Sequence, residues 1–574
     1  MKKPDNIEYG LHDRPPKQIA VLLALQQLSF LSVYMVVSPA LARALNLDFE
    51  QSLQLISATF LASGIGVMLQ AMGRFGIGSG YFCPLQNTSA TFGALIIAGM
   101  AGGNGAVFGA VGLMGLSQII FGYIFSKLRG VFNIQIAGLA IMLMGLMLGQ
   151  RGLGTILSGP DNSGPSINDF YICAGTLIPM IAANVSRFRY LKLFSAFIGL
   201  ASGTIISFVL GAIPLDHLSE FDPATHNYLP RPDQIAWSLH AESITPVLVS
   251  GLFLALHGFG ALALAQRFND ADWKSPNMHL IRRGITAEGL TNIIGSFLNA
   301  APITSSGGAV TLGAATGCTS RIVAFWLGGI MIFLAFAPRF VILVDALPDA
   351  MLGSAMIFLS CFTTMAGLQI ISSRLLDNRK ILTLGSGILL GISYEPLKEL
   401  IHGVIPESFK AFFFSGIGVG VMSAVLLSMV FRVFAHKHEK KIFNAAHSSF
   451  DEISSFLQRE GRSFGAQAGS VKRAEYATWQ AFDILLHHDL LDAAEDENPT
   501  ICVEAILNEY HFNIVLSYRG ILAPLALRPP TQDQLIHDET GVLQMAGYLL
   551  RKLADEVESE SEHHHCKLTL RFSE

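Results

Sequence analysis

Long apolar windows follow one another along the chain up to about residue 435, with short polar loops between them. Each window approaches the ~20 residues that an α-helix needs to cross a bilayer. Fourteen spans are expected, near residues 18–41, 52–72, 82–101, 105–126, 132–150, 168–185, 191–213, 244–266, 284–298, 300–316, 320–338, 348–369, 381–396 and 409–434. The pattern therefore predicts an all-α polytopic membrane protein.

The loops between these windows alternate in their content of lysine and arginine. One set holds Arg74, Lys127 and the pair Arg282-Arg283, whereas the other set includes the acidic loops 46–50 and 215–243. Cytoplasmic loops of membrane proteins carry the excess of positive charge. We therefore expect both termini in the cytoplasm, with residues 1–17 as a cytoplasmic N-terminal segment, and the chain in the inner (plasma) membrane.

Two of the windows are interrupted by proline, hydroxyl side chains and glycine. They are Tyr81–Phe92, around Pro84, and Ala300–Val310, around Pro302. Lipid cannot satisfy unpaired backbone groups, so such segments persist at membrane depth only inside protein or beside a water-filled cavity. A matched pair of broken spans marks the substrate site of many transporters.

The broken windows are the third and the tenth of the fourteen, so each is third in a set of seven. An odd number of spans per set makes the second set enter the membrane from the opposite side. The sequence thus predicts a 7+7 inverted repeat, with one half at 18–213 and the other at 244–434.

The side chains and backbone of the two broken segments are the candidate substrate ligands. They are Gln86, Asn87, Thr88, Thr304, Ser305, Ser306, Gly307 and Gly308. A helix that begins after each break would direct its N-terminal amides at the site and favour an acceptor or an anion there. The alternative is that these small residues only let helices pack closely, but their occurrence as a matched pair favours a site.

Four further polar residues lie within the apolar windows, where ionisable groups are rare and costly. His257 is expected to bind substrate or relay a proton, the alternative being a hydrogen-bonded core histidine. Glu288 is expected near the cytoplasmic start of its span, as a gating residue or as a structural cap. Gln26 and Gln27 are candidates for coupling or gating, with helix–helix hydrogen bonding as the alternative.

Composition supports a membrane protein with a soluble extension. The chain is 51% hydrophobic and 14% charged, whereas roughly a quarter of the residues of soluble domains are charged. Six cysteines are scattered without a CxxC motif, which predicts free thiols and no metal site. Residues 445–574 are more polar and predict an α/β cytosolic domain, with β-like runs at 512–520 and 566–572 and a helix at 547–557. Nothing indicates a nucleic-acid partner.

Over about residues 18–434 the chain resembles the xanthine/uracil permeases, the nucleobase–ascorbate transporter family. The motifs that carry the resemblance are Leu25-Gln26-Gln27, Gly78–Pro84, Ala287-Glu288-Gly289, Pro302–Gly307 and Gly367–Arg374. The resemblance implies a core domain and a gate domain, with short antiparallel strands in spans three and ten. It also implies a homodimer and uptake of a purine or pyrimidine base together with H⁺ or Na⁺.

Two positions depart from the family pattern. His257 stands where the family usually has a carboxylate in span eight, and Gly308 stands where many members have a carboxylate or glutamine in span ten. In the family, those groups normally bind the base and can couple its transport to protons. Their replacement here therefore affects both the expected substrate and the expected proton coupling.

The C-terminal region resembles a degenerate histidine-kinase-type ATPase domain. Glu504 and Asn508 have the spacing of that family's magnesium-binding helix, but an Asp-x-Gly-x-Gly motif is missing. A regulatory or dimerising module is expected. The run His563–His565 is interpreted as a polar surface loop rather than a metal site.

We expect a secondary transporter for a nucleobase such as xanthine, urate or uracil, with an elevator-like movement, no cofactor and no enzymatic activity. One alternative is an anion carrier of the sulfate/bicarbonate type. The other is a transporter-derived sensor that signals through the C-terminal domain.

Overall fold

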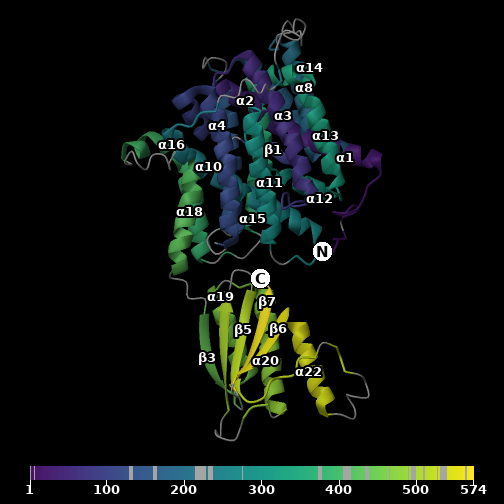
Figure 1. Cartoon of the computed structure of the whole chain (residues 1–574), viewed down its shortest axis with the longest axis vertical. Coiled ribbons are helices and arrows are strands. Elements are labelled where there is room, and N and C mark those ends of the chain that lie inside the picture. Colours follow the sequence, from purple (N-terminus) through teal and green to yellow (C-terminus); the bar gives the residue numbers. More distant parts are fainter. Residues whose placement is uncertain are drawn as a thin grey trace. The chain divides into compact units, whose positions relative to one another are not determined.

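The computed structural model describes residues 2–5, 7–88, 90–127, 134–158, 164–213, 228–229, 237–273, 276–372, 376, 378–404, 415–433, 438–445, 447–464, 466–488, 490–492, 499–507, 511–526, 528–530, 539–562 and 565–573. The chain forms two compact units (Figure 1). The membrane unit comprises Met1–Ser373 and Leu382–Leu427, and the C-terminal unit comprises Arg374–Ile381 and Ser428–Glu574.

Helices make up almost all of the regular structure before residue 434. They are α1 (Lys17–Met35), α2 (Val37–Ala44), α3 (Phe49–Met72), α4 (Phe92–Lys127), α5 (Ile134–Ser158), α6 (Ile167–Val185), α7 (Arg189–Leu193), α8 (Ser195–Val209), α10 (Ala241–Asn269), α11 (Met278–Phe297), α12 (Gly307–Ala315), α13 (Ile322–Ala335), α14 (Pro338–Asp345), α15 (Asp349–Ile371), α16 (Asn378–Val404) and α18 (Gly416–Val433).

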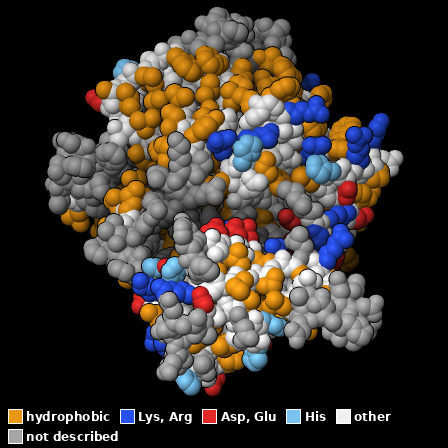
Figure 2. Space-filling view, turned by 60° about the horizontal axis from the view of Figure 1, so that its bottom comes forward, with side chains coloured by type: hydrophobic (Ala, Val, Ile, Leu, Met, Phe, Trp, Pro, Cys, Tyr) orange, Lys and Arg blue, Asp and Glu red, His pale blue; other side chains and the backbone are white. Residues whose placement is uncertain are grey.

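Among the described residues, six helices are long and apolar enough to cross a membrane, and the pair α13 and α14, bent by 83°, is a seventh candidate. Large hydrophobic side chains such as Val209 and Phe333 are more than two-thirds exposed. Hydrophobic side chains also cover much of the described surface in the upper part of Figure 2. Such a surface is stable against lipid and not against water, so the unit is integral to the membrane.

Local signals explain where several helices begin, end or bend. The Asp48 side chain accepts a hydrogen bond from the Gln51 backbone amide, and the Gln51 side-chain oxygen accepts one from the Asp48 backbone amide, which caps α3. The left-handed Gly73 ends the same helix. Non-helical angles at Gly102 and Gly103 break α4, so its two parts correspond to the second half of the third expected span and to the fourth span.

Glycines bring three pairs of helices into close contact. A Cβ added to Gly64 of α3 would lie 2.7 Å from the Gly328 carbonyl oxygen of α13, and one added to Gly115 of α4 would lie 2.5 Å from the Gly289 carbonyl oxygen of α11. Along α5 and α15, a Cβ at Gly353 would lie 2.5 Å from the carbonyl oxygen of Gly152. Only hydrogen fits in these spaces, so the backbones approach as closely as membrane helices can.

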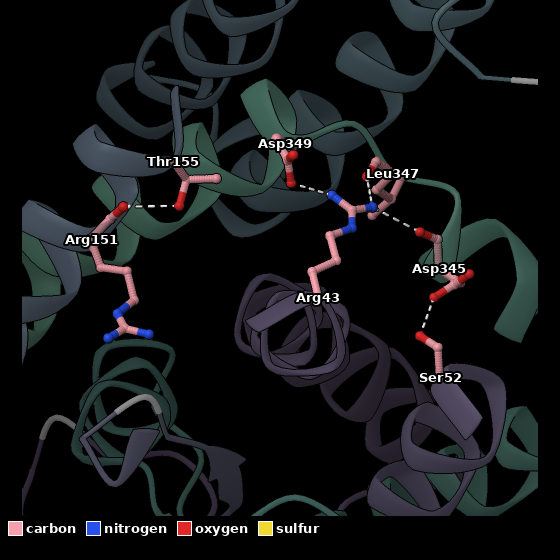
Figure 3. Close-up of polar contacts among 7 residues, drawn as sticks. All are labelled: Arg43, Ser52, Arg151, Thr155, Asp345, Leu347 and Asp349. Carbon is pink, nitrogen blue, oxygen red and sulfur yellow. Dashed lines mark hydrogen bonds and ion pairs between the residues drawn. The ribbon is translucent and has the colours of Figure 1, made fainter. Parts of the chain in front are cut away.

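Arg43, at the end of α2, holds the turn between α14 and α15 (Figure 3). Its guanidinium donates to the carbonyl oxygens of Asp345 at 3.0 Å and Leu347 at 2.6 Å, and it pairs with the Asp349 carboxylate. The Ser52 hydroxyl of α3 donates to the Asp345 carboxylate. These contacts tie α2 and α3 to the start of α15.

The C-terminal unit contains a five-stranded antiparallel sheet in the order β3-β4-β5-β7-β6. The strands are β3 (His438–Asn444), β4 (Thr500–Leu507), β5 (His511–Arg519), β6 (Glu556–Glu562) and β7 (His565–Ser573). Three helices pack against it, α19 (Phe450–Phe464), α20 (Ala468–His487) and α22 (Glu539–Leu553). Alternate strand residues such as Val503, Ile514 and Leu568 are buried in the core with the helices, as a half-buried sheet requires.

The strands expected at 512–520 and 566–572 are confirmed as β5 and β7, and α22 overlaps the helix expected at 547–557. The sheet begins at His438, ahead of the domain start expected at 445. The magnesium-binding helix expected around Glu504 is wrong, because Glu504 lies in β4 opposite Lys440 of β3. Asn508, His563 and His564 lie outside the described residues.

The contact between α5 and α15 predicts a measurable cost for Gly353→Val. The added side chain would collide with the backbone of α5, and overpacking of this kind destabilises proteins by about 1–3 kcal/mol. We expect a lower melting temperature of the purified protein in detergent. Gly329→Val on α13 is the matched control, because the nearest atom to its added Cβ is Met68 Cε at 3.9 Å. Equal melting temperatures for the two variants would contradict the close contact.

Candidate functional site

The two broken segments meet as a short antiparallel pair of strands, which confirms the strands implied by the family resemblance. Gln86 of β1 (Leu85–Asn87) lies opposite Thr304 of β2 (Ile303–Ser305). Beyond the strands, the Ser306 amide donates to the Pro84 carbonyl at 2.7 Å and the Thr88 amide donates to the Pro302 carbonyl at 3.3 Å. The two segments therefore satisfy much of each other's backbone in the membrane interior.

Each strand leads toward the start of a helix. The chain after β1 enters α4 at Phe92, and β2 enters α12 at Gly307. The Ser306 side chain accepts a hydrogen bond from the Ala309 amide at 3.1 Å and caps α12. Gly307 and Gly308 form the first turn of that helix, and the Phe30 ring fills the space beside Gly308.

His257 of α10 contacts the second strand. Its Nε2 lies 2.8 Å from the Ser305 carbonyl oxygen, and because a carbonyl only accepts hydrogen bonds, Nε2 carries the hydrogen. The Nδ1 atom is buried and has no hydrogen-bond partner in the described part of the chain. In the neutral ring, Nδ1 is therefore a hydrogen-bond acceptor that no described protein group uses. A ligand with an N–H or O–H group can donate to it.

Glu288 lies in the middle of α11 and is fully buried. The expectation that it sits at the cytoplasmic start of its span is wrong, because the helix begins ten residues earlier at Met278. Its carboxylate accepts from Gln118 Nε2 at 2.8 Å and from Thr304 Oγ1 at 3.4 Å, and it is hydrogen-bonded to the Ser305 hydroxyl. All three partners are uncharged.

Asn292, one turn after Glu288, acts as a further strand partner for β2. Its Nδ2 donates to the Ile303 carbonyl at 2.9 Å, and its Oδ1 accepts from the Ile303 amide at 2.9 Å. The same Nδ2 donates to Gln118 Oε1 at 3.0 Å. Gln118, Glu288 and Asn292 thus form one buried network that holds β2. The sequence interpretation missed Gln118 and Asn292, since a single amide in an apolar helix carries no local signal.

The first span flanks the strands on the opposite side from α10. Gln27 Nε2 donates to the Ala309 carbonyl at 3.2 Å, and Gln26 is buried but its Nε2 has no described partner. Asn87 donates to the Ser38 hydroxyl of α2, and Thr88 Oγ1 lies 3.6 Å from Met144 Sδ of α5. Of the expected site residues, only Gln26 is without a described contact to the paired segments or to their neighbours.

Several buried polar atoms around the strands have no hydrogen-bond partner in the described part of the chain. They are Gln27 Oε1, Gln86 Oε1, Asn87 Oδ1, Thr91 Oγ1 and His257 Nδ1. Buried polar atoms in proteins are nearly always hydrogen-bonded, so such a group marks a place that a polar ligand or water satisfies. The arrangement can bind a small neutral molecule that offers both donors and acceptors.

Arg151 lies within α5, whereas the sequence interpretation placed it in a loop. The fifth span was expected to end at residue 150, but α5 continues to Ser158. The Arg151 guanidinium lies 4.8 Å from the centroid of the Phe92 ring, at the start of α4. A cation over an aromatic face is attracted by the ring electrons. Arg151 therefore contacts the helix that follows β1.

Comparisons with known proteins identify relatives by sequence and a similar solved structure. The xanthine permease XanP of Escherichia coli (strain K12) is 27% identical over 447 residues, which cover 74% of this chain and 94% of that protein. The nucleobase transporter PlUacP of Paenibacillus larvae is 25% identical over 415 residues, covering 71% of this chain and 92% of that protein. The transmembrane domain of the cyanobacterium bicarbonate transporter BicA superposes with a TM-score of 0.42 at 13% identity, covering 73% and 99% of the two chains.

The model of the Permease family named Xan_ur_permease matches residues 18–399. This match covers more than half of the chain and includes both strands, His257 and Glu288. The chain is therefore an integral membrane transporter that belongs to the xanthine/uracil permease family.

Proposed function

We propose that this protein moves a nucleobase, such as xanthine, urate or uracil, across the inner (plasma) membrane by secondary transport. The observation that carries the proposal is that His257 contacts the paired strands, one of which contains Gln86, in a chain of this permease family. The names of the relatives XanP and PlUacP support xanthine or a related base as the substrate class.

The chemistry of the site suits the edge of a base. A nucleobase edge alternates N–H donors with carbonyl or ring-nitrogen acceptors. His257 Nδ1 and Gln86 Oε1 are buried and unpaired among the described residues, so they can accept from the N–H groups of such an edge. A site of this kind rejects molecules that leave its buried polar atoms unpaired.

The same chemistry weighs against the anion carrier. The side chains that contact β2 from α10 and α11 are the His257 imidazole, the Asn292 amide and the Glu288 carboxyl group, and the Gln27 amide of α1 contacts the neighbouring helix α12. A fully ionised sulfate or bicarbonate would lie near Glu288, whose charge disfavours it. An uncharged or weakly acidic base fits this environment better.

The proposed architecture is fourteen spans in a 7+7 inverted repeat, at 18–213 and 244–434. A two-fold axis that exchanges spans two and nine also exchanges spans eleven and four. The Gly64–Gly328 contact of α3 with α13 and the Gly289–Gly115 contact of α11 with α4 are related in this way. The strand register, with Gln86 opposite Thr304, is unchanged by the same exchange, and both observations support the repeat.

Two bodies are proposed to move past each other in transport. The core consists of spans one to four and eight to eleven, which hold both strands. The gate consists of spans five to seven and twelve to fourteen. Contacts support this division: α5 packs on α15 through Gly152 and Gly353, and α8 packs on α6 where a Cβ at Gly203 would meet Thr176 Oγ1 at 2.1 Å. An elevator-like movement of the core would carry the strands and the bound base.

Further parts of the proposal concern coupling and assembly. Glu288 is proposed to take up a proton or to sense Na⁺ together with substrate, since it contacts β2 through Thr304 and Ser305. Both termini are proposed to be cytoplasmic, the protein to be a homodimer, and residues 445–574 with β3 to form a regulatory or dimerising module.

A chain that ends near residue 440 should retain uptake. Loss of an output signal with base binding intact would favour the sensor alternative.

Ligand-induced stabilisation tests the substrate class. A ligand at a hundredfold excess over its Kd raises the free energy of unfolding by about 2.7 kcal/mol. We expect a rise in melting temperature with one or more of xanthine, urate, uracil, adenine and guanine. His257→Ala removes the acceptor and should weaken binding at least tenfold, whereas the exposed His279→Ala should not. Stabilisation by sulfate or bicarbonate alone would replace the base proposal with the anion carrier.

Glu288→Gln tests coupling while it preserves the shape of the side chain. The amide keeps hydrogen-bonding capacity toward Gln118 and Ser305 but cannot exchange a proton or carry a charge. We expect reconstituted Glu288→Gln protein to exchange base across the membrane without concentrating it under an imposed H⁺ or Na⁺ gradient. Concentrative uptake at the wild-type level by this variant would exclude Glu288 as the coupling residue.

A further inference from the structure

Gly308 leaves a space that a side chain of α1 fills. A Cβ added at Gly308 would lie 2.7 Å from Cζ and 3.1 Å from Cε1 of Phe30, and 3.8 Å from the Tyr34 hydroxyl. The φ angle of Gly308 is not in the left-handed region, so its conformation does not require glycine. The residue is small because the Phe30 ring occupies the adjacent space.

Phe30 belongs to a group of aromatic rings that joins α1 to α15. Its ring centroid lies 5.7 Å from that of Tyr34 and 6.2 Å from that of Phe362, with an edge-to-face angle of 84° in the second pair. Phe362 in turn lies 5.0 Å from Phe358, again edge to face. We call Phe30, Tyr34, Phe358 and Phe362 the aromatic wall. Edge-to-face pairs at these distances are favourable contacts that hold rings in a set orientation.

The aromatic wall reaches the strands through Tyr34. Its hydroxyl lies 3.0 Å from Thr363 Oγ1 of α15, and α1, which carries Tyr34, contacts β1. One turn before Phe30 on the same face of α1, Gln27 donates to Ala309 next to Gly308. The wall therefore lies against the first turn of α12, and α1 brings it beside β1.

Two rings of the aromatic wall are more exposed than the polar side chains at the strands. Gln86, His257 and Thr304 are at most 3% exposed. Phe30, Phe362 and Gly308 are each only partly buried. The two phenyl rings are therefore more accessible than the polar side chains at the strands.

We propose that the Phe30 ring is the surface on which a flat heteroaromatic substrate stacks, that Phe362, which stands edge to face with it, holds the ring in place, and that Gly308 is kept without a side chain so that Phe30 can reach this position. The inference rests on the proposed function and narrows it. Phe30 then determines specificity for planar bases, in addition to the hydrogen bonds of Gln86 and His257. Base–aromatic stacking tolerates any base because every base has a π-face, so the wall selects for planarity and the polar groups select the edge.

The test is uptake of a radiolabelled base into proteoliposomes that contain the full chain. Phe30→Leu keeps apolar volume and removes the ring, and we expect its KM to rise at least tenfold with little change in melting temperature. Phe170→Ala on α6, whose side chain is 54% exposed, is the control for loss of a ring elsewhere. Non-planar analogues that the wild type excludes should compete better in Phe30→Leu.

A double variant tests whether the Phe30 ring and the missing side chain at Gly308 fit each other. Gly308→Ala alone should lower uptake at least tenfold, because its methyl group collides with Phe30. Phe30→Ala/Gly308→Ala should recover to within threefold of Phe30→Ala alone. Gly329→Ala, with no atom nearer than 3.9 Å to the added Cβ, controls for glycine replacement in a membrane helix. Melting temperature and monodispersity report whether each variant is folded.

Several results would overturn the inference. Unchanged KM and unchanged competition by analogues in Phe30→Leu would exclude the stacking surface. Normal uptake by Gly308→Ala, or a double variant whose uptake is more than threefold below that of Phe30→Ala alone, would exclude the spatial fit. In each case wild-type uptake of a base leaves the proposed function intact. A wild-type protein that binds and transports no base would instead remove the proposed function, and the stacking surface with it.

Discussion

The hydrogen-bonding of backbone in the membrane interior is the constraint on which the site depends. Two three-residue strands cannot satisfy themselves in a medium without water. They pair with each other around Gln86 and Thr304, and the remaining groups are satisfied by side chains from the surrounding helices. Asn292 bonds both backbone groups of Ile303, and His257 bonds the Ser305 carbonyl. The proposed substrate site is therefore assembled from the same contacts that stabilise the broken spans.

The network around Glu288 has a chemical consequence because none of its described partners is charged. Gln118 Oε1 accepts from Asn292, which orients the Gln118 amide to donate to the carboxylate. The Ser305 hydroxyl can donate to an ionised carboxylate or accept from a protonated one. The network thus accommodates both protonation states without moving the strand. Because the Ser305 carbonyl also contacts His257, Glu288 and His257 are linked through this one residue.

The C-terminal unit has the alternating pattern of buried and exposed strand residues that is typical of a half-buried sheet. Alternate residues of β4, β5 and β7 face the helices, whereas the intervening ones carry pairs such as Glu504 with His438 and Arg571 with Glu556. The spacing of Glu504 and Asn508 was compatible with a helix only because spacing alone does not distinguish the two kinds of element. Pairing with β3, which begins at His438, sets the secondary structure of this stretch.

The sequence by itself determined the membrane class, the approximate positions of the spans and the two broken segments, because each depends on local hydropathy and on residues that a lipid-facing helix excludes. It also identified His257, Gln86 and the residues of β2 as site candidates. Tertiary structure alone decided that Glu288 lies at the strands, that Asn292 and Gln118 support them, and that Phe30 faces Gly308. These roles arise from contacts between helices far apart in the chain, and an asparagine, a phenylalanine or a glycine in an apolar helix looks the same in sequence whether it fills space or completes a site.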